Sequence, residues 1–149
     1  MEIIIRRLEA ADVSAVAAGE KECFAQPWSE RSFREALERE DLRYIVAQVD
    51  GKVAGHCGVY NVLGEGEIIN VAVYPDYRGH GLSKKMLEKL LEDGRLIGVK
   101  DYTLEVRAGN GPAIHVYEQL GFVTEGVRPG FYDFPKEDAL IMWLRENGE

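Results

Sequence analysis

The residues with the clearest potential for chemistry lie between Glu67 and Leu91. There an apolar segment, EIINVAVYP, breaks at Pro75 into DYRGHG and continues as LSKKMLEKLL, which has the periodicity of a helix. The first N–H groups of a helix have no partner within the helix, and the helix dipole is positive at that end. A glycine-containing turn between a strand and a helix therefore predicts a binding site for an anion, such as a phosphorylated cofactor.

The glycine spacing excludes two common phosphate loops. A Walker A loop needs Gly, four residues and then Gly-Lys-Ser/Thr, and the chain has no such run. A dinucleotide fingerprint needs a third glycine three residues after the second, but Lys84 stands there after Gly79 and Gly81. What remains is Arg78-x-x-Gly81-x-Ser83, which by itself also fits an ordinary strand–turn–helix connection.

This remaining pattern resembles the Arg/Gln-x-x-Gly-x-Gly/Ala signature of the GNAT acyltransferases, which wrap the loop around the pyrophosphate of acetyl-coenzyme A (acetyl-CoA). Ser83 departs from the Gly or Ala that is usual there. Three other segments extend the resemblance. DYTLEVRAGNGPAIHVYEQLGF, from Asp101, resembles the second GNAT signature, and WSERSFREAL and EDALIMWL are similar to the RimI-type branch, the ribosomal-protein N-terminal alanine acetyltransferases. The four segments follow the family order from Pro27 to Leu144.

Glu105 is our candidate general base. Strand alternation in Thr103–Val106 places Glu105 on the face opposite Leu104. Periodicity alone favours a solvated surface glutamate at this position. The resemblance implies instead that Glu105 is the base of RimI-type enzymes, acting through a water molecule.

Tyr117 is our candidate general acid. A phenol with a reference pKa of about 10 stays protonated at neutral pH and can donate to a thiolate. Spacing alone favours a packing aromatic beside Ile114 and Leu120. The resemblance implies that the Tyr117 hydroxyl faces the sulfur of coenzyme A.

The resemblance also implies which residues bind the two substrates. In GNAT enzymes the central strand and the strand that ends here at Val106 splay apart, and the pantetheine arm lies between them. Backbone amides of β-strand residues 71–73 should meet the acetyl group and pantetheine, and those of residues 78–84 the pyrophosphate. Asn110 should contact pantetheine, although it can equally cap a helix before Pro112. The expected cofactor-binding residues are Val71, Ala72, Val73, Arg78, Gly79, His80, Gly81, Leu82, Ser83, Lys84, Asn110 and Tyr117. Trp28 and Tyr132 should border the peptide groove, but Phe131-Tyr132-Asp133 departs from the family's Tyr-Tyr pair.

Taken together, these resemblances imply an acetyl-CoA-dependent N-acetyltransferase that acetylates the N-terminal α-amine of a protein or peptide, such as the N-terminal alanine of a ribosomal protein. At pH 7 an α-amine of pKa about 8 is deprotonated at a cost of roughly 1.4 kcal/mol, and a lysine amine at about 4.6 kcal/mol. This difference does not exclude lysine. A GNAT enzyme for lysine, polyamines or other small amines, and a non-catalytic acyl-CoA sensor, remain as alternatives.

The amino-acid composition supports an N-terminal acetyltransferase only weakly. Eighteen Lys and Arg against 26 Asp and Glu give a formal net charge of −8, which disfavours nucleic acid as a partner and suits a cationic acceptor. Two cysteines and three histidines show no metal-type spacing, so no metal site is expected. No apolar stretch approaches a membrane span. We expect a cytoplasmic protein with no membrane partner, as a monomer or weak dimer.

The 149 residues are expected to form a single GNAT acetyltransferase domain, residues 1–149, of α+β class. Strands are predicted at 3–7, 44–49, 52–63, 67–73, 102–106, near 122–127 and at 139–144. Helices are predicted at about 12–24, after a Ser29 N-cap, from 82 onward and at 112–120. Trp28 and Phe33 should form a hydrophobic staple at this cap, and Asp50-Gly51 should form a two-residue hairpin turn. The helix from 82 should bury one apolar stripe, which consists of Leu82, Met86, Leu87, Leu90 and Leu91. The prediction is a mixed, mostly antiparallel sheet of six to seven strands flanked by about four helices, with a frayed end at residues 147–149.

Overall fold

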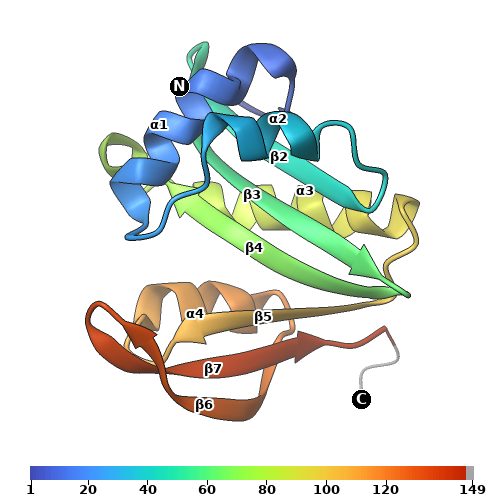
Figure 1. Ribbon diagram of the computed structural model, residues 1–149, viewed down its shortest axis with the longest axis vertical. Coiled ribbons are helices and arrows are strands. Elements are labelled where there is room, and N and C mark those ends of the chain that lie inside the picture. Colours follow the sequence, from blue (N-terminus) through green and yellow to red (C-terminus); the bar gives the residue numbers. More distant parts are fainter. Residues whose placement is uncertain (147–149) are drawn as a thin grey trace.

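A seven-stranded mixed sheet with the order β1-β2-β3-β4-β5-β7-β6 forms the centre of the computed structural model, which describes residues 1–146 (Figure 1). The predicted frayed end at 147–149 lies outside the described residues. All neighbouring strands are antiparallel except β4 and β5, which run parallel. The strands are β1 (Ile3–Arg7), β2 (Leu42–Val49), β3 (Lys52–Val62), β4 (Glu65–Val73), β5 (Asp101–Arg107), β6 (Val123–Asp133) and β7 (Lys136–Leu144).

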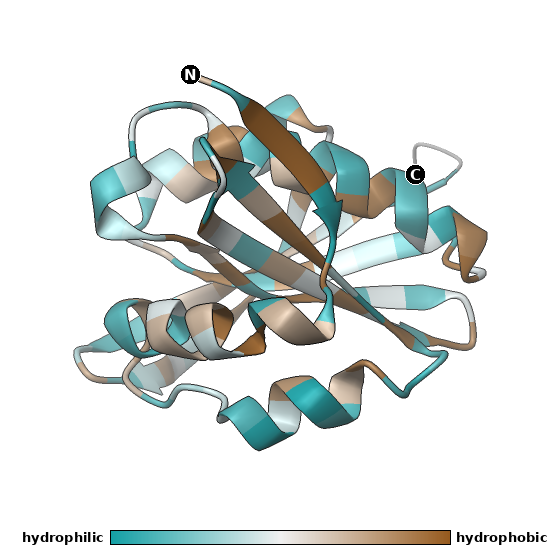
Figure 2. Cartoon of the chain, turned by 90° about the horizontal axis from the view of Figure 1, so that it is seen from above, coloured by the Kyte–Doolittle hydropathy of each residue, from teal (hydrophilic) through white to brown (hydrophobic). Residues whose placement is uncertain are grey.

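Helices cover both faces of the sheet, and apolar strand positions lie between the helical layers (Figure 2). The helices are α1 (Val13–Cys23), α2 (Glu30–Ala36), α3 (Leu82–Leu96) and α4 (Gly111–Gln119), with short 3-10 turns at Ala10–Asp12 and Pro75–Tyr77. One core lies under α3 and α4, and a second lies under α1 and α2. Within residues 1–146, no helix combines the length and the apolar character needed to cross a membrane. The predicted fold class is confirmed.

Local sequence signals place the first half of the fold. The Ser29 hydroxyl accepts a hydrogen bond from the Ser32 amide at 3.2 Å, and so caps the start of α2. Trp28 and Phe33 form the predicted hydrophobic staple, with ring centroids 5.3 Å apart. The predicted hairpin turn at Asp50-Gly51 is also present, because both residues adopt the positive φ angles, 48° and 84°, that such a turn requires.

The predicted apolar stripe of α3 faces the sheet. Its members, Leu82, Met86, Leu87, Leu90 and Leu91, are all buried. Their spacing of three and four residues puts them on one side of the helix, so packing against the sheet fixes the orientation of α3. The N-terminus of α3 is thereby held at the end of β4.

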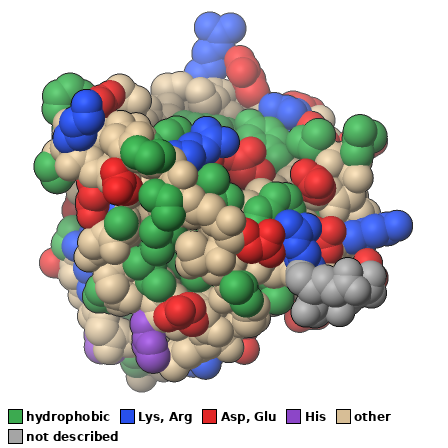
Figure 3. All heavy atoms as spheres, turned by 90° about the horizontal axis from the view of Figure 1, so that it is seen from below, with side chains coloured by type: hydrophobic (Ala, Val, Ile, Leu, Met, Phe, Trp, Pro, Cys, Tyr) green, Lys and Arg blue, Asp and Glu red, His purple; other side chains and the backbone are tan. Residues whose placement is uncertain are grey.

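The last hairpin is longer than predicted. β6 continues to Asp133 and β7 begins at Lys136, whereas the sequence indicated strands near 122–127 and at 139–144. β6 is an edge strand with two register shifts, so its hydrophobic pattern does not alternate. Apolar side chains show on this end of the molecule (Figure 3), where Val127, Phe131 and Phe134 are exposed.

Candidate active site

The two parallel strands at the centre of the sheet separate along their length. β4 and β5 pair only at Glu65–Asp101, Gly66–Tyr102 and Glu67–Thr103. Beyond these pairs the strands diverge toward their C-terminal ends (Figure 1). The splayed pair implied by the sequence resemblance is therefore confirmed. Residues 68–73 of β4 have no partner on the β5 side, so their backbone groups on this side can bind a ligand.

A β-bulge lies within this unpaired part of β4. Asn70 has a φ of 53°, and Asn70 and Val71 together lie opposite the single residue Cys57 of β3. A bulge leaves one residue out of the ladder and redirects the strand. The bulge was not predicted, although Asn70 is the one polar residue in IINVAV and asparagine tolerates a left-handed conformation. Of the expected acetyl-binding residues, Ala72 and Val73 pair with β3, and Val71 pairs with neither neighbouring strand.

The loop before α3 has the shape of an anion site. Gly79 and Gly81 adopt φ angles of 86° and 71°, and Gly81 is the N-cap residue of α3. A glycine N-cap offers no side-chain acceptor, so the first N–H groups of α3 stay available for a ligand. A Cβ atom at either glycine would meet no atom within 4 Å. The glycines are therefore needed for their backbone angles rather than for close packing within the protein.

The remaining residues of the loop differ in what they can offer. Arg78 directs its Nε to the Val73 carbonyl at 3.0 Å, so its side chain ties the loop to the end of β4. Leu82 is buried in the core and can contribute only its backbone. His80 is exposed, and Ser83 and Lys84 are half-buried in the first turn of α3. The backbone of the loop, more than its side chains, forms the anion site.

Glu105 lies on the β5 face that the sequence predicted, with Leu104 and Val106 buried on the other face. Its Oε2 atom is buried and has no hydrogen-bond partner among the described residues. The nearest cation is the Arg128 Nε at 3.6 Å, and the Arg128 side chain is 57% exposed. A buried carboxylate oxygen without a donor is costly, which is typical of a site that receives a ligand or water.

Tyr117 is buried on α4, and its ring centroid lies 6.0 Å from that of Phe122. Burial raises the pKa of the Tyr117 hydroxyl above its usual value, and Cys57 and Tyr132 add smaller effects in the same direction. The phenol therefore keeps its proton at neutral pH and can act only as a donor of that proton or as a neutral acceptor. No hydrogen-bond partner for this hydroxyl is found within residues 1–146.

Tyr132 connects the two candidate catalytic residues. Burial raises the pKa of Tyr132, and the Glu105 carboxylate raises this pKa further. Tyr132 in turn raises the pKa of the Tyr117 hydroxyl. The Arg107 guanidinium lies 4.3 Å from the centroid of the Tyr132 ring and fixes the ring in place. Electrostatic effects thus link Glu105 to Tyr132 and Tyr132 to Tyr117.

Trp28 and Asn110 have clear structural roles. The Asn110 side chain accepts a hydrogen bond from the Ala113 amide at 3.3 Å and caps α4, as the sequence allowed. Its amide NH2 group is left for a ligand. Trp28 is half-buried and packs against Phe33 and Tyr44, on the core that lies under α1 and α2. The expected place of Trp28 at the peptide groove therefore stays a prediction.

Comparisons with known proteins agree with this geometry. Residues 13–122 match the acetyltransferase (GNAT) family. A [ribosomal protein bS18]-alanine N-acetyltransferase of Escherichia coli is 38% identical over 142 residues, which cover 94% of this chain and 95% of the relative. The chain belongs to the GNAT acetyltransferase family. The GNAT acetyltransferase described here is therefore an enzyme, and its acyl donor is acetyl-CoA.

Solved structures show the same fold for this GNAT acetyltransferase. The crystal structure of the ribosomal-protein-S18-alanine N-acetyltransferase from E. coli superposes with a TM-score of 0.85 at 36% identity, over 97% of this chain and 94% of that one. An acetyltransferase from Salmonella typhimurium, solved with its cofactor acetyl-CoA, gives a TM-score of 0.87 at 20% identity, over 98% and 95% of the two chains. The second likeness shows the fold alone.

Proposed function

We propose that this enzyme transfers the acetyl group of acetyl-CoA to the N-terminal α-amine of a protein, with a ribosomal protein as the acceptor and residues 1–149 as one catalytic domain. The observation that carries the proposal is the buried carboxylate oxygen of Glu105, which accepts no hydrogen bond from residues 1–146 and lies on β5 beyond the positions where β5 pairs with β4. The E. coli relative, named for the alanine of bS18, supports this class of acceptor. We place the reaction in the cytoplasm, with no nucleic acid or membrane as partner and with the enzyme as a monomer or weak dimer.

In this proposal the chain's own residues hold the reacting groups and move two protons. The loop at residues 78–84 binds the pyrophosphate, and the amides at Val71 to Val73 hold the thioester carbonyl, whose oxygen gains charge as the amine attacks. Glu105 receives the proton of the attacking amine through a water molecule. The N–C bond forms as the C–S bond breaks, and Tyr117 gives its proton to the departing sulfur.

Three further features favour the N-terminus of a peptide as the acceptor. A free α-amine has a reference pKa of about 8, so a base of modest strength suffices to deprotonate it. The half-buried rings of Tyr132 and Trp28 provide aromatic surface on which the first residues of a peptide can pack. The formal charge of −8 attracts an acceptor that carries basic residues.

A panel of acceptors tests this proposal. We expect initial rates with acetyl-CoA to be highest for peptides that begin with a free alanine. Rates should fall close to background for the same peptides with a blocked α-amine and an internal lysine, and for spermidine. Faster acetylation of a blocked peptide or of spermidine would overturn the proposed acceptor while leaving the acetyltransferase class intact.

The pyrophosphate loop gives a prediction of its own. Coenzyme A at about 100 times its dissociation constant should add roughly 2.7 kcal/mol to the free energy of unfolding and raise the melting temperature. Gly81→Asp should abolish this shift, because it sets a carboxylate at the N-terminus of α3 where the phosphates bind. Differential scanning fluorimetry with and without coenzyme A measures the effect.

Gly81→Asn is the matched control for this loop. Asparagine has nearly the same shape as aspartate, tolerates the positive φ at this position and carries no charge. It should retain most of the coenzyme A shift. Equal loss of the coenzyme A shift in both variants would mean that the conformation of the loop, and not the charge, decides binding. An intact shift in Gly81→Asp would mean that this loop does not bind the phosphates.

A further inference from the structure

A buried carboxylate outside the proposed catalytic residues holds together several parts of the chain. Glu20, in α1, is 2% exposed. Its Oε2 accepts hydrogen bonds from the Trp28 amide at 3.0 Å and from the Asn70 Nδ2 at 2.8 Å. Its Oε1 lies 2.8 Å from the His56 Nε2, and the His56 Nδ1 lies 2.7 Å from the Tyr74 hydroxyl. In the His56 tautomer that carries its proton on Nε2, His56 donates to Glu20.

One of these partners is the residue that forms the β4 bulge. Asn70 has a left-handed backbone, and neither Asn70 nor Val71 pairs with a neighbouring strand. The ladder therefore does not fix the orientation of the peptide units at this point. The hydrogen bond from the Asn70 side chain to Glu20 does fix it, because it ties the bulge to α1 in the buried interior.

The second partner belongs to the connection that borders the acceptor peptide in the proposed function. The Trp28 amide immediately precedes the Ser29 cap of α2, and it bonds to the same Glu20 oxygen as Asn70 does. A single oxygen atom thus connects the strand that would hold the thioester to the connection that would border the acceptor peptide. Catalysis of a two-substrate reaction depends on such mutual placement, and a misplacement of about 1 Å can cost roughly 10² in rate.

We propose that Glu20 is a positioning residue that sets the β4 bulge in register with the acceptor-side connection at Trp28. This inference rests on the proposed function, in which the β4 amides hold the thioester carbonyl. Glu20 touches neither substrate. It acts through Asn70 on the acetyl group and through Trp28 on the peptide.

Four variants test the role of Glu20. Glu20→Ala should lower kcat by about 10² and raise the peptide KM, while the Kd of coenzyme A changes little, because the hydrogen bonds of Glu20 go to Trp28, His56 and Asn70 and not to the pyrophosphate loop. Asn70→Gly keeps the positive φ accessible but removes the bond to Glu20, so kcat should fall to a similar degree. The double variant should be no slower than the slower single variant, because both changes break one link.

Glu20→Gln provides the rescue by a conservative change. The glutamine carbonyl can accept from Asn70 and Trp28, and its NH2 group can donate to His56 once the imidazole adopts the other tautomer. It should retain most of the wild-type kcat. Loss of kcat as severe as in Glu20→Ala would contradict a role through these hydrogen bonds.

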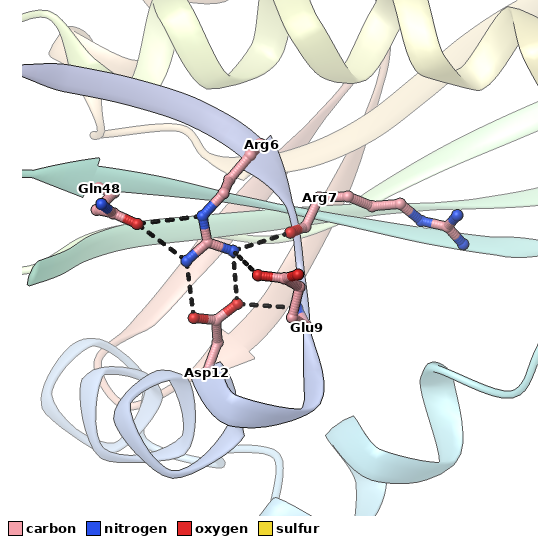
Figure 4. Close-up of polar contacts among 5 residues, drawn as sticks. All are labelled: Arg6, Arg7, Glu9, Asp12 and Gln48. Atoms are coloured by element: carbon pink, nitrogen blue, oxygen red, sulfur yellow. Dashed lines mark hydrogen bonds and ion pairs between the residues drawn. The ribbon is translucent and has the colours of Figure 1, made fainter. Parts of the chain in front are cut away.

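Asp12→Ala is the matched structural control. Asp12 is also a buried carboxylate, and it accepts hydrogen bonds from the two Arg6 NH groups at 2.8 and 2.9 Å and from the Glu9 amide at 2.8 Å (Figure 4). Arg6 lies on the edge strand β1, three strands away from β4 in the sheet. Asp12→Ala should lower the melting temperature but leave kcat per folded enzyme unchanged.

The rates are measured well below the melting temperature of every variant, on the acceptor that the wild type acetylates fastest. A different preferred acceptor would therefore overturn the proposed function without affecting this test. Wild-type kcat in folded Glu20→Ala would overturn the role of Glu20. If Glu20→Ala does not fold, Asn70→Gly decides, since wild-type kcat in that variant would equally show that the link does not position the bulge.

Discussion

Glu105→Gln should slow acetyl transfer at pH 7 by about 10², the typical cost of losing a general base. The unfolding free energy should stay within about 1 kcal/mol of the wild type, because the Glu105 oxygen that is buried accepts no hydrogen bond and its ion pair involves an exposed arginine. The rate of the variant should recover in part between pH 7 and pH 9. In this range an α-amine of reference pKa about 8 loses its proton without help. Single-turnover rates and chemical denaturation measure the two effects.

Glu125→Gln is the control for this change. Glu125 also pairs with an arginine, Arg145, at the far end of β6, and this hydrogen bond holds the pKa of the Glu125 carboxyl below its usual value. The control should leave the rate at its wild-type value across the same pH range. A wild-type rate for Glu105→Gln from pH 6 to pH 9 would return Glu105 to the class of solvated surface residues.

Tyr117→Phe should lower turnover by roughly one to four orders of magnitude while the affinity for coenzyme A changes by about tenfold or less. The substitution keeps the ring and its contact with Phe122, so packing is preserved. Only the hydroxyl that would protonate the departing thiolate is lost. Chemistry must be the measured step, so single-turnover rates are needed beside steady-state rates.

Tyr102→Phe separates this effect from the loss of any buried hydroxyl. Tyr102 on β5 is also buried, and its hydroxyl donates to the Leu91 carbonyl of α3. Its removal should reduce the unfolding free energy by about 0.5–1.5 kcal/mol and leave the acetylation rate unchanged. If Tyr117→Phe behaved in the same way, the sulfur would have to take its proton from water or from the amine.

The parts of the fold that the sequence predicts well are those determined by local signals. The Ser29 cap, the Trp28–Phe33 staple and the Asp50-Gly51 turn each depend on residues within a few positions of one another. The apolar stripe of α3 runs from Leu82 to Leu91, over almost three turns, so its buried face could be assigned without knowledge of the sheet. The splayed strands came from the family resemblance, because the spacing of residues within β4 and β5 does not show which strand lies beside which.

The features that the sequence did not predict depend on contacts between distant segments. Glu20 lies 50 residues from Asn70 in the chain, and only the packing of α1 on β4 brings the two together. The bulge itself depends on the register between β3 and β4. Arg128 lies beside Glu105 because β6 follows β7 across the end of the sheet, and the exposed, non-alternating sequence of β6 gave no signal for this. Asn70 within an apolar strand was the one available hint.

The most direct test of the proposed function uses one peptide that carries two amines. A peptide that begins with a free alanine and contains one internal lysine is incubated with acetyl-CoA and the wild-type enzyme, and tandem mass spectrometry locates the acetyl group. The account predicts acetylation of the α-nitrogen of alanine, with the lysine unmodified at early times and the signal reduced about 10² in Glu105→Gln. Acetylation of the lysine Nζ ahead of the α-nitrogen would contradict it.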